Sequence, residues 1–137
     1  MDKMIKDIYN ISLDLKSIPD DNKDSMTEWY FDLINKTYDQ LNIFDVTRML
    51  IQKIFLELAI PRAIAFITND PFCGQRYEGE LLEVLSWTEI SYLEGYKDSL
   101  LKVLTEAAKK NKYYEWFCED EREEFNQNIE TFLHKLL

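Results

Sequence analysis

Apolar residues recur at every third or fourth position along most of this sequence, which is the period of an amphipathic helix. Val46, Met49 and Leu50, for example, fall on one stripe of a predicted helix. Proline and turn-forming residues interrupt the pattern and set the expected breaks. The sequence predicts helices over residues 3–10, after an N-cap at Ser25, after a cap at Asp45, over 61–68 after a kink or break near 58–60 caused by Pro61, from Leu81, over 89–110 after a cap at Thr88, and from Asp120.

Signals for β-hairpins are scarce. The 137 residues include only three glycines and three prolines, and the apolar patterns follow the helical period. Gly95 falls inside the predicted helix over 89–110 and is expected to weaken it locally. We therefore predict an all-α fold, a single compact domain over residues 1–137 with about five to seven helices.

The composition indicates a folded chain with excess negative charge. Hydrophobic residues make up 46% and aromatic residues 14%, which predicts a packed core despite a net charge of -10. This charge repels phosphate backbones, so direct nucleic-acid binding is not expected. No apolar run approaches the ~20 residues that span a bilayer, and charged residues near the amino terminus leave no signal-peptide core. We expect a cytoplasmic protein without membrane contact.

Residues suited to catalysis or to binding transition metals are few. His134 is the only histidine and falls near the end of a predicted helix. A positive charge there would complement the helix dipole, so we favour this role over a catalytic one. Cys73 and Cys118 are far apart and have no metal-ligand spacing. The sequence thus predicts a binding protein and not an enzyme, with no catalytic residue, metal or cofactor. A carboxylate-based or Mg-dependent enzyme and a helical regulatory adaptor remain the alternatives.

The acidic segment 77–98 is the first candidate for a partner-binding surface. It holds six acidic residues and one lysine, so most of its acids have no partner within the segment. Acids around an exposed aromatic ring are typical of an interaction surface, although core packing is the simpler interpretation of Trp87. The predicted face consists of Tyr77, Glu78, Glu80, Glu83, Trp87 and Glu89.

A second acidic cluster opens the last predicted helix. Acids in a first turn complement the helix dipole, so a solvated helix start explains them without any partner. The same charges could also form an interaction patch. The secondary candidates for partner binding are Glu119, Asp120, Glu121 and Glu124.

Residues 42–85 contain a recognisable pattern, in which an ordered loop leads into a helix. It consists, in chain order, of Asp45, Val46, Arg48, Leu50, Gln52, Pro61, Ala63, Asp70, Pro71, Gly74, Tyr77, Gly79, Glu80, Leu81 and Leu82. Over this stretch the chain resembles the contact-dependent growth inhibition (CDI) immunity proteins of bacteria. Much of the pattern also has a structural interpretation, because glycines permit unusual backbone angles and Tyr77, Leu81 and Leu82 are suited to packing.

The resemblance implies an α-helical cytoplasmic protein that binds the toxic C-terminal domain of a delivered effector, in a heterodimeric complex, and blocks it. Such toxins are often nucleases, so we expect a nuclease, with an RNase favoured. A nuclease that binds phosphates has a basic cleft, and an acidic partner would associate with it quickly through complementary charge. The resemblance is loose over the first forty residues and does not include 99–137. We therefore expect partner specificity to lie outside the shared pattern.

Overall fold

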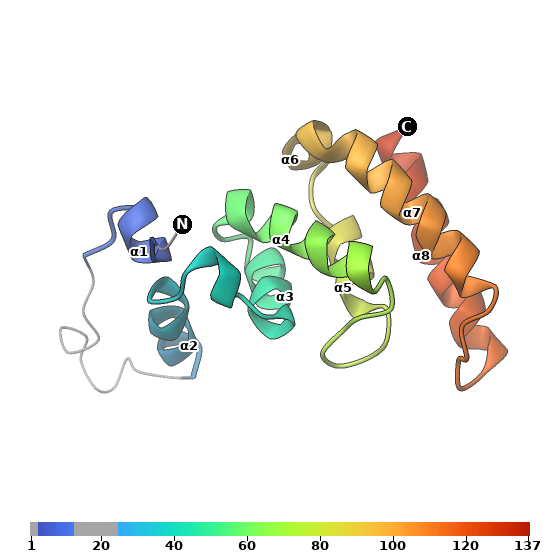
Figure 1. Cartoon of the computed structure of the whole chain (residues 1–137), viewed down its shortest axis with the longest axis horizontal. Helices are drawn as coiled ribbons and strands as arrows, with labels where there is room; N and C mark the ends of the chain where they lie inside the picture. Colours follow the sequence, from blue (N-terminus) through green and yellow to red (C-terminus); the bar gives the residue numbers. More distant parts are fainter. Residues whose placement is uncertain (1–2, 13–24) are drawn as a thin grey trace.

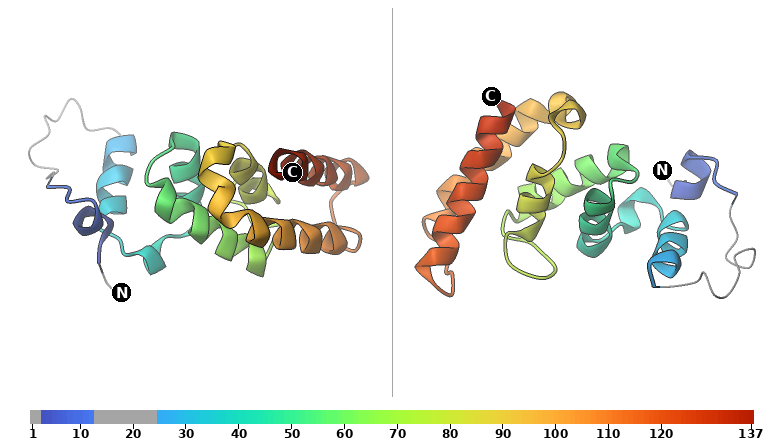
Figure 2. Two further views of the ribbon diagram at one scale, coloured as in Figure 1. Left: turned by 90° about the horizontal axis from the view of Figure 1, so that it is seen from above. Right: turned by 180° about the vertical axis from the view of Figure 1, so that it is seen from behind.

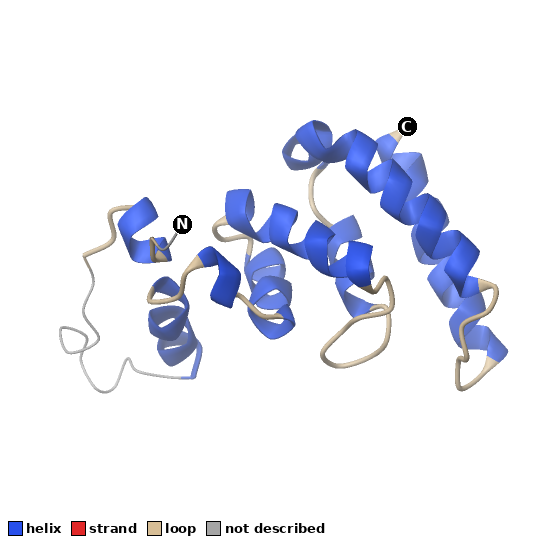
Figure 3. Ribbon diagram, in the orientation of Figure 1, coloured by secondary structure: helices blue, strands red, loops and turns tan. Residues whose placement is uncertain are grey.

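The computed structural model describes residues 3–12 and 25–137, and these are mainly helical (Figure 3). Within the described residues there is no strand, and the one β-type pairing is an isolated bridge between Met4 and Thr37. The predicted all-α class is confirmed, and the six helices longer than a single turn agree with the expected number. In chain order the helical segments, with η for 3₁₀ helix, are α1 (Ile5–Ile8), α2 (Ser25–Ile34), η3 (Tyr38–Gln40), α3 (Ile43–Gln52), α4 (Leu56–Asn69), α5 (Glu80–Ser86), α6 (Ile90–Leu93), η4 (Glu94–Tyr96), α7 (Lys97–Asn111) and α8 (Glu119–Leu136).

The helices succeed one another along the long axis of the molecule roughly in sequence order (Figure 1). In the middle, α3 packs against α4 and α5, and α4 also packs against α5. At one end α7 and α8 form an antiparallel hairpin, and the left view of Figure 2 shows the two helices side by side. Contacts of α4 with α7 and of α5 with α8 join this hairpin to the middle. One cluster of buried apolar residues accordingly extends from Ile5 to Leu136.

Asp45 has a different role from the predicted helix cap. The N-cap of α3 is Asn42, whose side chain accepts the N–H of Asp45, while the Asp45 carboxylate accepts the N–H of Asn42 in return. Asp45 is also buried, and it accepts the indole N–H of Trp29 at 3.1 Å and the Lys36 ammonium at 2.6 Å. A capping box explains the correction, because its acid occupies the third helical position. The same carboxylate ties α2 to α3.

Of the kink or break predicted near 58–60, the break is wrong, and no fresh helix starts at Pro61. The break comes earlier, where Lys53 and Phe55 adopt left-handed backbone angles, and α4 then continues through Pro61. A proline inside a helix removes one backbone donor. Ile60, directly before Pro61, and Ala63, two residues after it, are buried, so burial of the apolar face keeps the helix continuous.

The predicted helix over 89–110 is divided. A 3₁₀ turn centred on Gly95 separates α6 from α7, which is a larger effect than the local weakening that was expected. The N-cap of α6 is Glu89 and not Thr88, whose carbonyl instead accepts the Lys135 ammonium. The last helix begins at Glu119, one residue before the predicted Asp120. Among the described residues, no helix is both long and apolar enough to cross a membrane.

Candidate functional site

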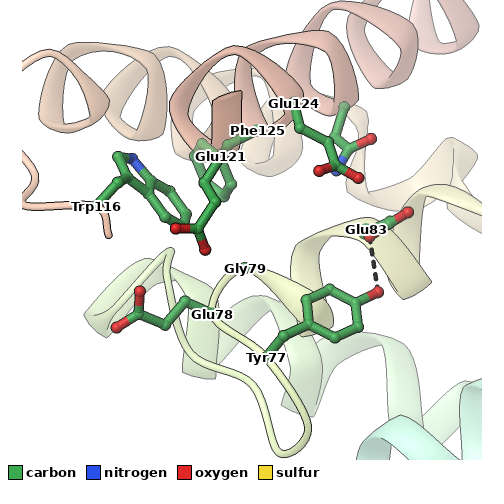
Figure 4. Close-up of a pocket in the computed structure, with 9 residues that line it drawn as sticks. Tyr77, Glu78, Gly79, Glu83, Trp116, Glu121, Glu124 and Phe125 are labelled. Atoms are coloured by element: carbon green, nitrogen blue, oxygen red, sulfur yellow. Dashed lines mark hydrogen bonds between the residues drawn. The ribbon is translucent and has the colours of Figure 1, made fainter. Parts of the chain in front are cut away.

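A hollow of about 410 Å³ lies between α8 and the segment formed by α5 and its preceding loop (Figure 4). Four glutamates and three aromatic residues line it, and its nine lining residues include no lysine or arginine. Negative charge is therefore concentrated in a concave part of the surface. The lining residues are Tyr77, Glu78, Gly79, Glu83, Trp116, Glu121, Glu124, Phe125 and Asn128, which we call the acidic hollow.

One wall of the acidic hollow is a loop over residues 70–79 that is closed by its own hydrogen bonds. The N–H of Gly79 donates to the carbonyl of Phe72 at 2.7 Å, and the N–H of Leu81 donates to the carbonyl of Cys73 at 3.3 Å. Asp70 ends α4, and its carboxylate accepts the N–H of Phe72 at 3.0 Å. Because these bonds join both ends of the loop, the wall is held in one shape.

Glu80 anchors the same loop from inside. Its side chain has no exposed surface, and it accepts the backbone N–H groups of Gln75 and Arg76, each at 2.9 Å, as well as Arg76 Nε. Burial acts to raise the pKa of Glu80, but these hydrogen bonds outweigh it and hold the pKa below its usual value. The expectation that Glu80 is an unpaired acid is thus wrong. In this structure it offers no surface to a partner.

The two glycines of the loop are required for different reasons. Gly79 has a φ of 84°, in the left-handed region, and a Cβ there would lie 2.8 Å from the ring of Phe125. Gly74 has ordinary angles, but a Cβ would lie 2.0 Å from the carbonyl oxygen of Tyr77. The predicted need for unusual angles therefore holds at Gly79 only. Tyr77, which was expected to pack, leaves 45% of its surface exposed.

Two tyrosine hydroxyls hold two of the glutamates. Tyr77 donates to Glu83 at 2.7 Å, shown by the dashed line in Figure 4, and Tyr114 donates to Glu78 at 2.8 Å. Burial, the bond to Glu83 and its charge raise the pKa of Tyr77. The same causes, with Glu78 as the acceptor, raise the pKa of Tyr114 to about 12. Each glutamate is therefore oriented while its carboxylate retains further acceptor capacity.

The opposite wall comes from the connection between α7 and α8 and from the first turns of α8. The indole N–H of Trp116 donates to the side chain of buried Asn111 at 2.7 Å, which fixes the indole at the rim. Glu121 accepts the N–H of Cys118 at 3.1 Å. Glu124 has no hydrogen bond or ion pair within the described part of the chain. It is thus the acid of the hollow whose carboxylate is fully available.

Aromatic stacking joins the two walls. The rings of Phe72, from the loop, and Tyr114 stack with centroids 3.8 Å apart. Phe125 of α8 lies 5.0 Å from Phe72 and 5.5 Å from Trp116, again between ring centroids. Such contacts stabilise beyond simple area burial. The shape of the acidic hollow therefore depends on packing between segments that are distant in the sequence.

The predicted acidic face is divided by the structure. Tyr77, Glu78 and Glu83 line the acidic hollow, where Glu121 and Glu124 from the second predicted cluster join them. The two clusters, which the sequence presented as alternatives, thus share one concave surface. Whether this surface binds a partner remains a prediction.

The remaining predicted residues lie elsewhere. Trp87 and Glu89 border a separate hollow of about 150 Å³ that also includes Lys53, and Trp87 is 56% exposed. This second hollow shares no lining residue with the first. Glu119 pairs with Arg122 at 2.9 Å, and Asp120 is exposed.

Sequence reasoning missed four residues of the acidic hollow: Trp116, Phe125, Asn128 and Gly79, of which the last was given a backbone role only. The first two follow patterns that predict core packing, and a single asparagine on a helix carries no signal. Trp116 is half-buried and Phe125 is buried, so packing is indeed part of their role. Only the meeting of α8 with the 70–79 loop shows that they also face the hollow.

The fold and the site together define a helical protein with an acidic, aromatic-lined recess, the kind of surface that binds a basic partner. Residues 7–103 match the family model of CDI immunity proteins, and the chain belongs to this family. The match extends well beyond 42–85. It includes most of the first forty residues, over which the resemblance to the family is loose. It ends before α8, and the α8 wall of the acidic hollow lies outside it. No curated protein matches the sequence.

Proposed function

We propose that this protein binds the C-terminal toxin domain of a CDI effector and neutralises it by occupying or covering a basic cleft, without catalysis of its own. The toxin is a nuclease, with an RNase favoured. The observation that carries the proposal is the acidic hollow, whose lining holds four carboxylates and no basic side chain. Membership in the CDI immunity family supports the toxin as the partner.

Charge complementarity explains why such a recess suits a nuclease. A cleft that binds phosphates carries lysine or arginine, and a concave acidic surface draws these cations in through its field. Tyr77 and Trp116 add aromatic faces, on which a guanidinium can stack. The acids would chiefly raise the rate of association, whereas any acid fully desolvated against a toxin cation would slow dissociation.

Glu83 and Glu124 are the acids to test, because they lie on opposite walls of the acidic hollow (Figure 4). Neither is the buried loop anchor, so the double variant Glu83→Lys, Glu124→Lys should keep its fold. The matched control is Glu94→Lys, Glu130→Lys, which changes the net charge equally at two exposed positions outside the hollow.

The experiment measures association with the CDI toxin domain of the effector gene expected immediately upstream of this gene, at low and high salt. The hollow variant should associate on the order of tenfold more slowly or worse at low salt and lose much of its salt dependence, whereas the control should change about twofold or less. Growth of cells that produce the toxin gives the second measurement. Equal protection and equal rates for both variants would show that the toxin binds elsewhere.

A further inference from the structure

The connection between α7 and α8, residues 112–118, carries the two most exposed large apolar side chains of the described chain. Phe117 is 98% exposed and Tyr113 is 85% exposed. In Figure 1 this connection forms a tip at the end of the molecule opposite α1. Single exposed apolar residues are common, but a bare phenylalanine ring beside a recess needs a reason.

The backbone on both sides of Phe117 is fixed. Trp116 is held through its indole N–H by Asn111, and the N–H of Cys118 donates to Glu121 at 3.1 Å. The ring of Phe117 therefore projects into solvent from a connection that is anchored immediately before and after it. A residue presented in this way loses little conformational freedom when a partner binds.

Asn111 and Arg122 hold the rest of the connection. The Asn111 side chain is buried and donates to the carbonyl of Arg122 at 3.1 Å and to Asn126 at 3.0 Å. Arg122 in turn donates to the carbonyl of Asn111 and, at 3.0 Å, to the carbonyl of Tyr114. In this network a buried amide and a guanidinium hold the shape of a surface loop. Such an arrangement is expected when the loop must meet a partner in one conformation.

We propose that Phe117 is a hydrophobic anchor for the toxin domain and enters an apolar recess beside the toxin's basic cleft. This inference rests on the proposed function. The connection is continuous with the acidic hollow, because Trp116 lines the hollow and precedes Phe117 directly. Exposed Glu115 and Glu119 lie two residues before and two residues after Phe117 in the chain, so the matching toxin surface is an apolar recess with a basic rim.

The anchor also accounts for recognition of one particular toxin. The family match ends at residue 103, so the whole 112–118 connection lies outside the matched residues. The acidic hollow supplies charge, which many basic clefts satisfy, whereas an apolar ring carried between two hydrogen-bonded residues requires an apolar recess at the matching position. Phe117 is thus a specificity-determining residue.

The test compares Phe117→Ala with Tyr92→Ala, which removes another exposed aromatic ring at a separate hollow. Because Phe117 is nearly fully exposed, its removal should leave the melting temperature unchanged. Phe117→Ala should raise the dissociation rate of the toxin complex on the order of 30-fold, with little change in association rate or salt dependence. Tyr92→Ala should leave the dissociation rate unchanged.

Each outcome separates the two proposals. If the hollow variant weakens binding and Phe117→Ala does not, the anchor is wrong and the proposed function stands. If Phe117→Ala speeds dissociation and the hollow variant leaves the association rate and its salt dependence unchanged, the anchor stands and the acidic hollow is not the charged contact. If neither variant changes binding, the anchor is wrong, the acidic hollow is not the contact surface, and the toxin binds elsewhere. Sedimentation of the free protein supplies one more check, because a dimer that Phe117→Ala converts to monomer would assign the ring to a second copy and overturn the anchor.

Discussion

Arg76 leaves 65% of its side chain exposed, yet its Nε donates to the carboxylate of Glu80, whose side chain is completely shielded from solvent. The pair therefore joins the outside of the 70–79 loop to an acid beneath it. Glu80 is the first residue of α5, so the same carboxylate links the loop to the helix that packs against α8. Removing Glu80 should thus affect the loop more than any exposed acid does.

We expect Glu80→Ala to lower the free energy of unfolding by about 3 kcal/mol, because two backbone N–H groups and a guanidinium lose their acceptor. Urea denaturation measures the change. Glu94→Ala, at an exposed position, is the control and should change the free energy by about 0.5 kcal/mol or less. A loss at Glu80 no larger than that of the control would contradict the anchoring role.

The bond between Tyr114 and Glu78 predicts a loss of stability at high pH. The pKa of Tyr114 is raised from 10.0 to about 12, so the folded state holds this proton more tightly than the unfolded state does. Its contribution is fully present below the unfolded pKa and is lost as the pH rises through the folded pKa. Tyr114→Phe should therefore cost about 0.5 to 1 kcal/mol at pH 8 and almost nothing above about pH 12.

Tyr113→Phe is the matched control for that titration. Tyr113 is 85% exposed, and its hydroxyl has no hydrogen bond in the residues described. Denaturation of both variants and of the wild type at several alkaline pH values gives the comparison. A stability difference for Tyr114→Phe that stays constant up to the highest pH would show that the hydroxyl bond does not set the effect.

How far the sequence predicts this fold depends on the range of each interaction. The all-α class follows from the period of the apolar residues, which is a local property, and the helix predicted after Ser25 is present as α2. Caps are less certain, because Asn42 and Asp45 both suit an N-terminus and only the reciprocal bonds decide between them. The position of the break before α4 depends on left-handed backbone angles at Lys53 and Phe55. Neither lysine nor phenylalanine commonly adopts such angles, so the sequence does not predict the break.

The candidate site shows the same limit more strongly. Its acids are visible in the sequence, but the burial of Glu80 is not. Nothing in the local sequence around Glu80 indicates that backbone N–H groups and a guanidinium will donate hydrogen bonds to it. The acidic hollow requires α8 to reach the 70–79 loop, which is a tertiary contact. From the sequence alone, residues 77–89 and 119–124 are two alternative candidate sites. Packing of α8 against the loop brings residues from both segments into one surface.

Lys53 offers a test with the opposite sign. It ends α3 with a φ of 58°, where a side chain is strained and glycine is not. Lys53→Gly should raise the free energy of unfolding by about 0.5 to 1 kcal/mol, seen as a higher urea midpoint. Gln52→Gly, one residue earlier in helical conformation, should lower it by about 0.5 to 1 kcal/mol. Equal losses at both positions would contradict the left-handed assignment.

The two cysteines should differ sharply in reactivity. Burial and the charge of Asp70 raise the pKa of Cys73 to about 11, so about a thousandth of it is thiolate at pH 8. Cys118 is exposed. Iodoacetamide at pH 8 should therefore modify Cys118 first, as peptide mass mapping would show, and Cys118→Ala should leave a protein that reacts only slowly until it is unfolded. Rapid labelling of Cys73 in the folded protein would contradict this.

The aromatic contacts between Phe72, Tyr114 and Phe125 have a consequence for how the protein is made. During translation the chain leaves the ribosome from its amino terminus, and folding follows in that order. The 70–79 loop and α5 can emerge long before residue 125, but the rings that complete their packing have then not yet been synthesised. A nascent chain stopped before α8 would carry the acids of only one wall. Protection of the cell by this surface would therefore begin only after ribosomes have translated through residue 128, the last residue that lines the hollow.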